Sequence, residues 1–328
     1  MILNGVNIEG GNGPIVGWSM GDTLSSSEGG VVSNTKKAIF GYGFSSPNYT
    51  SITNLVSDTG VVASNTTGVG TARTFIAAAG YGTDKAIFGY GSPSNGVSTA
   101  ITNLVSNTGV VATDTAGVGT ARYNIAAAGY GTDKAIFGYG FTPGPTVYSL
   151  TNLVSNTGTV ASDTTGVGTA RYNLAAAGYG SSGQAIFGYG FTGAYPALSM
   201  TNLVSNTGVV ATDTTGVGTG RSNLAAAGYG GDKAIFGYGA NAAQTNTAIT
   251  NLVSNTGVVA TDTTGVGTAR RLLAAATYGT DKAIFGYGSS ASGLVSLTNL
   301  VSNTGVVATD TAGVGTARTG LAAAGYSL

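Results

Sequence analysis

The chain has 328 residues, of which 13 are lysine or arginine and 13 are aspartate or glutamate, so its formal net charge is zero. This balance leaves no basic surface for a phosphate backbone and argues against a nucleic-acid partner. The sequence contains no Cys and no His, which excludes disulfides, thiolate metal sites and most catalytic constellations, and we predict neither a metal site nor a cofactor.

The chain begins MILNGVNIEGGNG, without a cationic leader, and no apolar run reaches 18 residues. We therefore expect a soluble chain with no classical signal peptide and no membrane insertion. Seventeen Tyr, ten Phe and 56 Gly with so little charge favour a packed β-rich protein over disorder.

Residues 1–35 fit no part of the pattern that follows, and we interpret them as an N-terminal arm or adaptor. This segment holds Trp18, the single Trp of the chain, close to Ile15 and Val16. These three apolar residues are the candidate anchoring surface of the arm.

From residue 36 the chain is a repeat. The segment KAIFGYG, or QAIFGYG in one copy, recurs six times at intervals of 48 to 50 residues, beginning at Lys37, Lys85, Lys134, Gln184, Lys233 and Lys282. A period of this size indicates a propeller or a solenoid.

Each repeat divides into four short segments bounded by Gly, Asn, Asp and Ser, which favours strands joined by hairpins. In one copy they are Asn124–Tyr130, Lys134–Tyr139, Leu150–Ser155 and Thr159–Asp163. Four antiparallel strands in about 49 residues is the pattern of one propeller blade. We therefore predict an all-β fold, a six-bladed β-propeller at residues 36–328.

The ends of the array support this prediction. The first copy enters at its second segment, and the last copy ends with one further AAAGY segment, Leu321–Tyr326. A closed ring explains the offset, because the C-terminal strand then completes the sheet begun near residue 37 and removes the unpaired edges. An open β-solenoid is the alternative, and it gives no reason for the offset.

The succession GTAR, AAAGYGTDKAIFGYG and TNLVSNTG resembles the kelch repeat over residues 36–328. Two features depart from that family: Gly138-Tyr139-Gly140 replaces its double glycine, and its outer-strand Trp is missing. The resemblance implies a propeller fold. Near-identical Gly-Tyr-rich repeats are also similar to propellers predicted in bacteriophage structural proteins, which implies a location in the virion.

We find no catalytic constellation in the repeats. The GYGTDK segment lacks the spacing of a phosphate-binding loop, and no repeat carries a distinctive nucleophile or carboxylate pair, so we predict that the protein is not an enzyme. One Arg recurs at the same position of every repeat, and we expect it to form a structural ion pair with the Asp on the strand before it, with Asn65 in the sixth place. Anion binding on the axis is the alternative. These arginines are Arg73, Arg122, Arg171, Arg221, Arg270 and Arg318.

Two segments of each repeat vary: the loop between the second and third strands, and the two residues after the Arg. In an up-and-down blade both emerge on one face, and the constant turns emerge on the other. Varied loops on a rigid scaffold favour recognition, although loops also vary where nothing depends on them. The candidate binding residues are Phe44, Tyr49, Tyr123, Asn124, Phe141, Tyr148, Tyr172, Asn173, Phe191, Tyr195, Asn241, Gln244 and Arg271.

The leading hypothesis is a non-enzymatic, virion-associated display module of the phage tail-fibre, spike or appendage type. It would bind a glycan or protein on the host surface through the varied loops, and other virion or assembly proteins through the arm and the constant face. The alternatives are a capsid or tail decoration or cement protein without a receptor role, and a free lectin-like propeller.

Overall fold

The computed structural model describes residues 2–3, 6–7, 36–194 and 196–328, and we restrict every structural statement to them. Contacts divide the chain into two units, Met1–Ser33 and Asn34–Leu328. In the first unit, β1 (Ile2–Leu3) pairs with β2 (Val6–Asn7) in an antiparallel ladder. The anchoring residues Ile15, Val16 and Trp18 lie outside the described residues.

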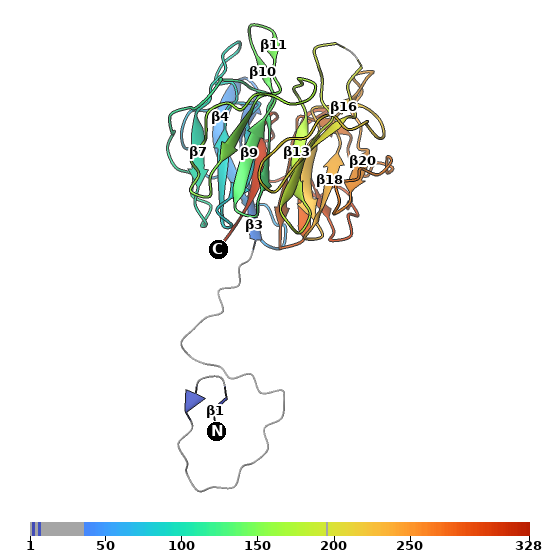
Figure 1. Ribbon diagram of the computed structural model, residues 1–328. Helices are drawn as coiled ribbons and strands as arrows, with labels where there is room; N and C mark the ends of the chain where they lie inside the picture. Colours follow the sequence, from blue (N-terminus) through green and yellow to red (C-terminus); the bar gives the residue numbers. More distant parts are fainter. Residues whose placement is uncertain (1, 4–5, 8–35, 195) are drawn as a thin grey trace. The chain divides into compact units, whose positions relative to one another are not determined.

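The second unit is built of antiparallel sheets, and its described residues form no helix (Figure 1). Six sheets of three strands repeat one order: a first strand, a middle strand and a third strand. The first strands are β27 (Ala322–Ser327), β5 (Ala77–Tyr81), β8 (Ala126–Tyr130), β13 (Ala175–Tyr179), β17 (Ala225–Tyr229) and β22 (Ala274–Tyr278).

The middle strands are β3 (Lys36–Ser45), β6 (Lys85–Gly89), β9 (Lys134–Gly138), β14 (Gln184–Gly188), β18 (Lys233–Gly237) and β23 (Lys282–Gly286). The third strands are β4 (Asn48–Val56), β7 (Thr102–Val105), β12 (Thr151–Val154), β15 (Thr201–Val204), β20 (Thr250–Val253) and β26 (Thr298–Val301). The all-β class predicted from the sequence is thus confirmed.

The last strand completes the first sheet. Strand β27 pairs with β3 from Ala322–Gly41 to Ser327–Lys36, and β3 pairs with β4. The predicted pairing of the C-terminal strand with the segment near residue 37 is confirmed. First strands of successive sheets contact each other in the order β5, β8, β13, β17, β22, β27, and β27 contacts β5.

The predicted fourth strand is not continuous. In one repeat the fourth segment touches the third strand through two isolated bridges, Val154 with Val160 and Thr151 with Thr164. Between the bridges the fourth segment advances by one residue more than the third strand, which breaks the ladder as a bulge does. The side chain of Asn152 occupies the gap and donates to the Ala161 carbonyl at 3.0 Å.

The hydrophobic core is divided into six clusters. In one of them the ring of Phe187 packs on that of Tyr139 from the preceding sheet, with ring centroids 5.1 Å apart. The same ring lies so close to Gly138 that a β-carbon there would be 2.7 Å from it. Tyr139 and Gly140 both have positive φ, 67° and 106°. The Gly-Tyr-Gly sequence therefore follows from aromatic packing on one side and a left-handed turn on the other.

A buried arginine joins each pair of neighbouring sheets. The side chain of Arg122 is 0% exposed and donates to the Tyr139 carbonyl (2.7 Å), the Thr120 carbonyl (2.9 Å) and Asn152 Oδ1 (2.6 Å). Its guanidinium lies over the ring of Tyr90 from the preceding sheet, 4.9 Å from the ring centroid. We call this set of contacts the arginine node. The node makes contacts with both neighbouring sheets at once.

The Asp that we predicted as the partner of each Arg is the wrong one. Arg122 pairs with Asp163 of the following repeat, at 3.4 Å, and not with the Asp on the strand before it. The chain segment carrying the Arg lies beside the next sheet's fourth segment, where Asp163 also accepts from the backbone N–H and hydroxyl of Thr120. All six arginines are fully buried. The predicted ion pair with an Asp is found for four of them among the described residues: Arg73, Arg122, Arg171 and Arg270.

Burial raises the pKa of Tyr139 to about 12, so this residue stays a neutral hydrogen-bond donor to the Val167 carbonyl. Burial alone would raise the pKa of Asp163 as well. Hydrogen bonds from Thr120 and Asn152, together with the nearby charge of Arg122, outweigh burial and hold this pKa below its ordinary value. The carboxylate therefore remains ionised in the fold.

We expect Arg122→Lys to lower the free energy of unfolding by about 3 kcal/mol. An ammonium cannot keep the bonds to Tyr139 and Asn152 together, and an acceptor left unsatisfied inside the protein is costly. Chemical denaturation measures the loss. The control is Arg271→Lys, a half-buried arginine without an ion pair among the described residues, which should shift stability by less than about 0.5 kcal/mol. Equal stability of the two variants would contradict the role of the node.

Lowering the pH should destabilise the fold by protonating the Asp side chains at the position of Asp163. Five such side chains have a pKa below the ordinary value: Asp114, Asp163, Asp213, Asp262 and Asp310. A carboxyl whose pKa is lower in the folded than in the unfolded state adds stability above the unfolded value of about 3.9. That stability disappears as pH falls through the folded value. Urea unfolding between pH 6 and pH 3 should show the decline.

Asn65 provides the control for this prediction, because it takes the sixth position and its Oδ1 accepts from Asn54 (3.0 Å) and the Thr316 N–H (3.1 Å). Asp163→Asn copies that arrangement and removes one titrating group. The variant should therefore lose less stability than the parent between pH 6 and pH 3. An unchanged loss would show that Asp163 does not contribute to the acid sensitivity.

Candidate functional site

The two varied segments of each repeat pair with one another. Tyr123 bridges to Phe141 and Tyr172 bridges to Phe191, each through two backbone hydrogen bonds of 2.9 to 3.0 Å. The same pairing is extended into short strands in later repeats: β16 (Arg221–Ser222) with β19 (Ala240–Asn241), and β21 (Arg270–Arg271) with β24 (Ser289–Ser290). Strand β24 also pairs with β25 (Gly293–Leu294). The prediction that both segments share a face is confirmed, and we call it the varied face.

One loop of the varied face forms its own hairpin, β10 (Phe141–Thr142) with β11 (Thr146–Val147). In Figure 1 this hairpin stands at the end of the unit opposite to the C-terminus. The constant turns between first and middle strands lie at the C-terminal end. The two ends of the unit therefore carry different kinds of sequence, one varied and one repeated.

Five aromatic rings form a continuous row on the varied face. Ring centroids are 6.0 Å apart for Phe75 and Tyr123, 5.4 Å for Tyr123 and Phe141, 5.0 Å for Phe141 and Tyr172, and 5.4 Å for Tyr172 and Phe191. All five side chains are half-buried. We call them the aromatic row. It runs across three successive repeats and unites four residues predicted from the sequence with Phe75.

The second residue after each Arg lies in a ring of backbone hydrogen bonds. Asn124 N–H donates to the Phe75 carbonyl at 3.0 Å, and Asn173 N–H donates to the Asn124 carbonyl at 3.0 Å. The series continues through Asn223, Leu272 and Gly320, and Phe75 N–H donates to Gly320, so the six bonds return to their start. All six residues have φ between 54° and 62°. The ring thus has one backbone geometry and four different residue types, since three of the six positions are Asn.

Asn124 and Asn173 line a small hollow of about 70 Å³ inside this ring, together with Ile125 and Leu174 below them. Both asparagines are half-buried, and neither side-chain amide makes a hydrogen bond within the described part of the chain. These amides are neighbours of Tyr123 and Tyr172 in the chain. The hollow therefore places hydrogen-bonding groups beside the aromatic row.

The other predicted residues do not join the row. Phe44 and Tyr49 form a separate pair on β3 and β4, with ring centroids 5.4 Å apart. Asn241 Oδ1 accepts from the backbone of Ala243 and Thr245, which gives it a structural role in its loop. Gln244 is exposed.

Tyr148 and Arg271 are half-buried, and Tyr148 bonds through its backbone to Gly140 at 2.9 Å. Tyr195 lies outside the described residues. The predicted set is therefore divided between the aromatic row, the small hollow that Asn124 and Asn173 line, and isolated positions on the loops.

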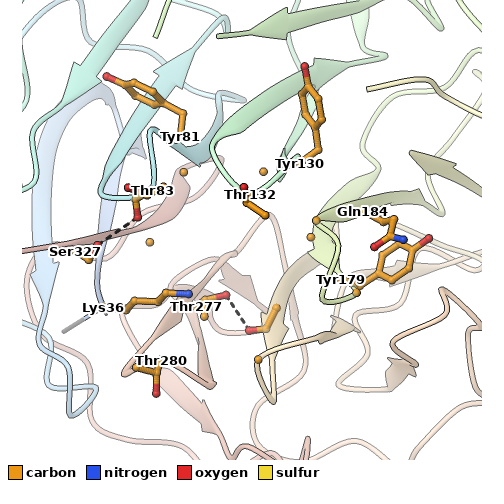
Figure 2. Close-up of a pocket in the computed structure, with 18 of the residues that line it drawn as sticks. Lys36, Tyr81, Thr83, Tyr130, Thr132, Tyr179, Gln184, Thr277, Thr280 and Ser327 are labelled. Carbon is orange, nitrogen blue, oxygen red and sulfur yellow. Dashed lines mark hydrogen bonds between the residues drawn. The ribbon is translucent and has the colours of Figure 1, made fainter. Parts of the chain in front are cut away.

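A larger cavity of about 400 Å³ lies at the other face, where the constant turns meet, and the sequence analysis did not predict it (Figure 2). Its lining includes Lys85 and Lys134, each bonded to the Asp before it, at 2.8 and 2.9 Å. The hydrogen bond with Asp133 raises the pKa of Lys134. The ammonium charges at this cavity are thus largely balanced by their neighbours.

Thr277 interrupts the regularity of the cavity wall. Five repeats have Gly at this position of the first strand, and in the sixth the Thr277 hydroxyl donates to the Gly228 carbonyl at 2.8 Å (Figure 2). Thr83, Thr132 and Thr280 lie at the rim with φ of 70°, 68° and 84°, a backbone region that β-branched residues rarely adopt. The equivalent residue of another repeat is Gly231, with φ of 79°.

We expect Thr83→Gly to raise the free energy of unfolding by about 1 kcal/mol. Glycine adopts a positive φ without strain, and the strain removed exceeds the extra backbone entropy that glycine loses on folding. Thermal or urea unfolding measures the gain. Thr108→Gly is the matched control, since Thr108 lies in a constant turn of the same face without a positive φ and its replacement should be destabilising. A loss of stability in both variants would contradict strain at Thr83.

No protein-family model matches the sequence, and no curated protein matches it significantly. No helix of the described part of the chain is both long and apolar enough to cross a membrane. The described residues also contain no group of three or more acidic side chains suited to a metal ion. The assignment of a function therefore rests on the geometry of the two faces.

Proposed function

We propose that the six three-stranded sheets and their fourth segments are the blades of a six-bladed, kelch-like β-propeller. Two cyclic series of backbone hydrogen bonds support this proposal. One is the ring on the varied face that begins and ends at Phe75. The other, on the constant face, links Gly82 to Asp133 and continues through each repeat until Ser327 bonds to Asp84.

The proposed function is non-enzymatic recognition of a surface through the varied face. The aromatic row is the observation that carries this proposal. The segment after the Arg pairs with the loop between the second and third strands in every repeat, whether its first residue is Tyr123, Ser222 or Arg271. Because this backbone pairing does not require aromatic rings, their concentration across three neighbouring repeats favours a binding role.

The resemblance of the repeats to phage propellers supports a place in a virion, as part of a tail fibre, spike or appendage. In this proposal residues 1–35 and the constant face attach the protein to other particle proteins. The varied face would then bind a glycan or protein on the host cell.

A decoration or cement role is the second candidate. Five repeats expose a valine of the fourth segment, with exposed fractions of 64 to 66%: Val61, Val110, Val209, Val258 and Val306. An apolar group repeated on the outer segments would suit packing against a shell. The sixth position is held by Thr159.

Immunogold labelling of purified particles and adsorption assays on the propagating bacterium test these roles. A particle carrying Tyr123→Ser and Tyr172→Ser should contain the protein at normal copy number and adsorb at least tenfold more slowly. Val258→Thr, which copies Thr159, is the control and should leave adsorption unchanged. Normal adsorption of the tyrosine variant would contradict recognition. Lost incorporation of the valine variant would favour the cement role, and unlabelled particles would contradict both.

A further inference from the structure

Two adjacent repeats carry the same three side chains in the same arrangement on the varied face. One set is Tyr123, Asn124 and Phe141, and the other is Tyr172, Asn173 and Phe191. The Tyr and Phe centroids are 5.4 Å apart in both sets, and the ring planes meet at 79° and 82°. The two asparagines have φ of 54° and 56°. The sets therefore match in residue type, in the geometry of the ring pair and in the φ of the asparagine.

The other four repeats share the backbone of this site but not its residues. The positions of Tyr, Asn and Phe are held there by Thr, Phe and Ser; by Ser, Asn and Ala; by Arg, Leu and Ser; and by Thr, Gly and Phe. The last of these combinations is Thr319, Gly320 and Phe44, and Phe44 bridges to Thr319 as Phe141 bridges to Tyr123. Arg271 pairs with Ser289 in the same way, in a repeat that has neither an aromatic ring nor an amide at these positions. The fold therefore does not explain the duplicated set.

The two sets are joined into one surface. Phe141 of the first set lies 5.0 Å from Tyr172 of the second, centroid to centroid, and the Asn173 N–H donates to the Asn124 carbonyl at 3.0 Å. Asn124 and Asn173 line the same small hollow, and their amides have no hydrogen-bond partner within the described residues. A ligand longer than one unit would therefore meet the same groups twice.

The chemistry of the duplicated set is uncharged. Its aromatic rings offer an electron-rich face to C–H groups, and its amides can both donate to and accept from hydroxyl groups. None of its six residues carries a charge, so an anionic ligand would lose hydration there without gaining a counter-charge. A pyranose, with a C–H face and a rim of hydroxyls, matches both kinds of group.

We infer that the two sets are equivalent subsites for an uncharged oligosaccharide built from a repeated sugar unit. This inference rests on the proposed recognition function and specifies its ligand class. Each Tyr and Phe pair packs against one sugar ring, and the adjacent Asn amide bonds to its hydroxyl groups. The repetition of the subsites matches the repetition of the ligand.

Isothermal titration of the full chain with neutral oligomers of glucose, galactose, mannose and N-acetylglucosamine, one to six units long, tests the inference. At least one series should bind, and its affinity should rise at least tenfold from the monosaccharide to the tetrasaccharide as both subsites fill. Tyr123→Ala and Tyr172→Ala should each weaken tetrasaccharide binding by about three- to tenfold and flatten the dependence on length.

The matched control is Ser292→Ala, in an exposed loop of the varied face outside both sets. It should bind like the parent, and circular dichroism should show that all variants remain folded. No binding in any series, or equal binding by the tyrosine and control variants, would overturn the inference. If the oligomers fail while the intact chain still binds the propagating bacterium, recognition stands without a neutral glycan; if both fail, the proposed function falls as well.

Discussion

The buried arginine node is the interaction on which the rest of the structure depends. Arg122 lies over Tyr90 of one sheet and donates to Tyr139 and Asn152 of the next, without any exposed surface of its own. A buried guanidinium is tolerable when its donors are satisfied and a counter-charge is near, and here both neighbouring sheets are needed to provide that environment. Each sheet is therefore held in place by the sheets before and after it.

Several constant residues of the repeat are explained by the contacts between neighbouring sheets, at the node and beside it. Gly138 is required because the Phe187 ring lies against it, and Asn152 both accepts from Arg122 and occupies the break in the outer ladder. Asp163 ties the segment that carries Arg122 to the following repeat. The near-identity of the repeats thus has a structural cause. It also means that conspicuous constant residues such as Arg122 are weak guides to a binding site.

On the varied face the backbone pairing recurs in every repeat, but the side chains differ. The backbone of this face is regular, since the six residues of the ring of backbone hydrogen bonds that contains Asn124 have φ between 54° and 62°. Side chains at these positions range from Gly320 to Asn124 and Leu272 without altering the ring. Such a surface can change its chemistry without changing its scaffold. Local aromatic and amide groups then give two neighbouring repeats a character that the others lack.

The sequence by itself determined the all-β class, the pairing of the last strand with the first sheet and the shared face of the varied segments, because these depend on strand periodicity and chain phase. Only the tertiary structure decided which Asp meets Arg122, that the fourth segment breaks into bridges, and that five rings from three repeats meet in one row. Those outcomes depend on how neighbouring sheets pack against each other, and a repeat read along the chain does not contain that packing. The 400 Å³ cavity at the constant face escaped prediction for the same reason, since turns distant in sequence enclose it together.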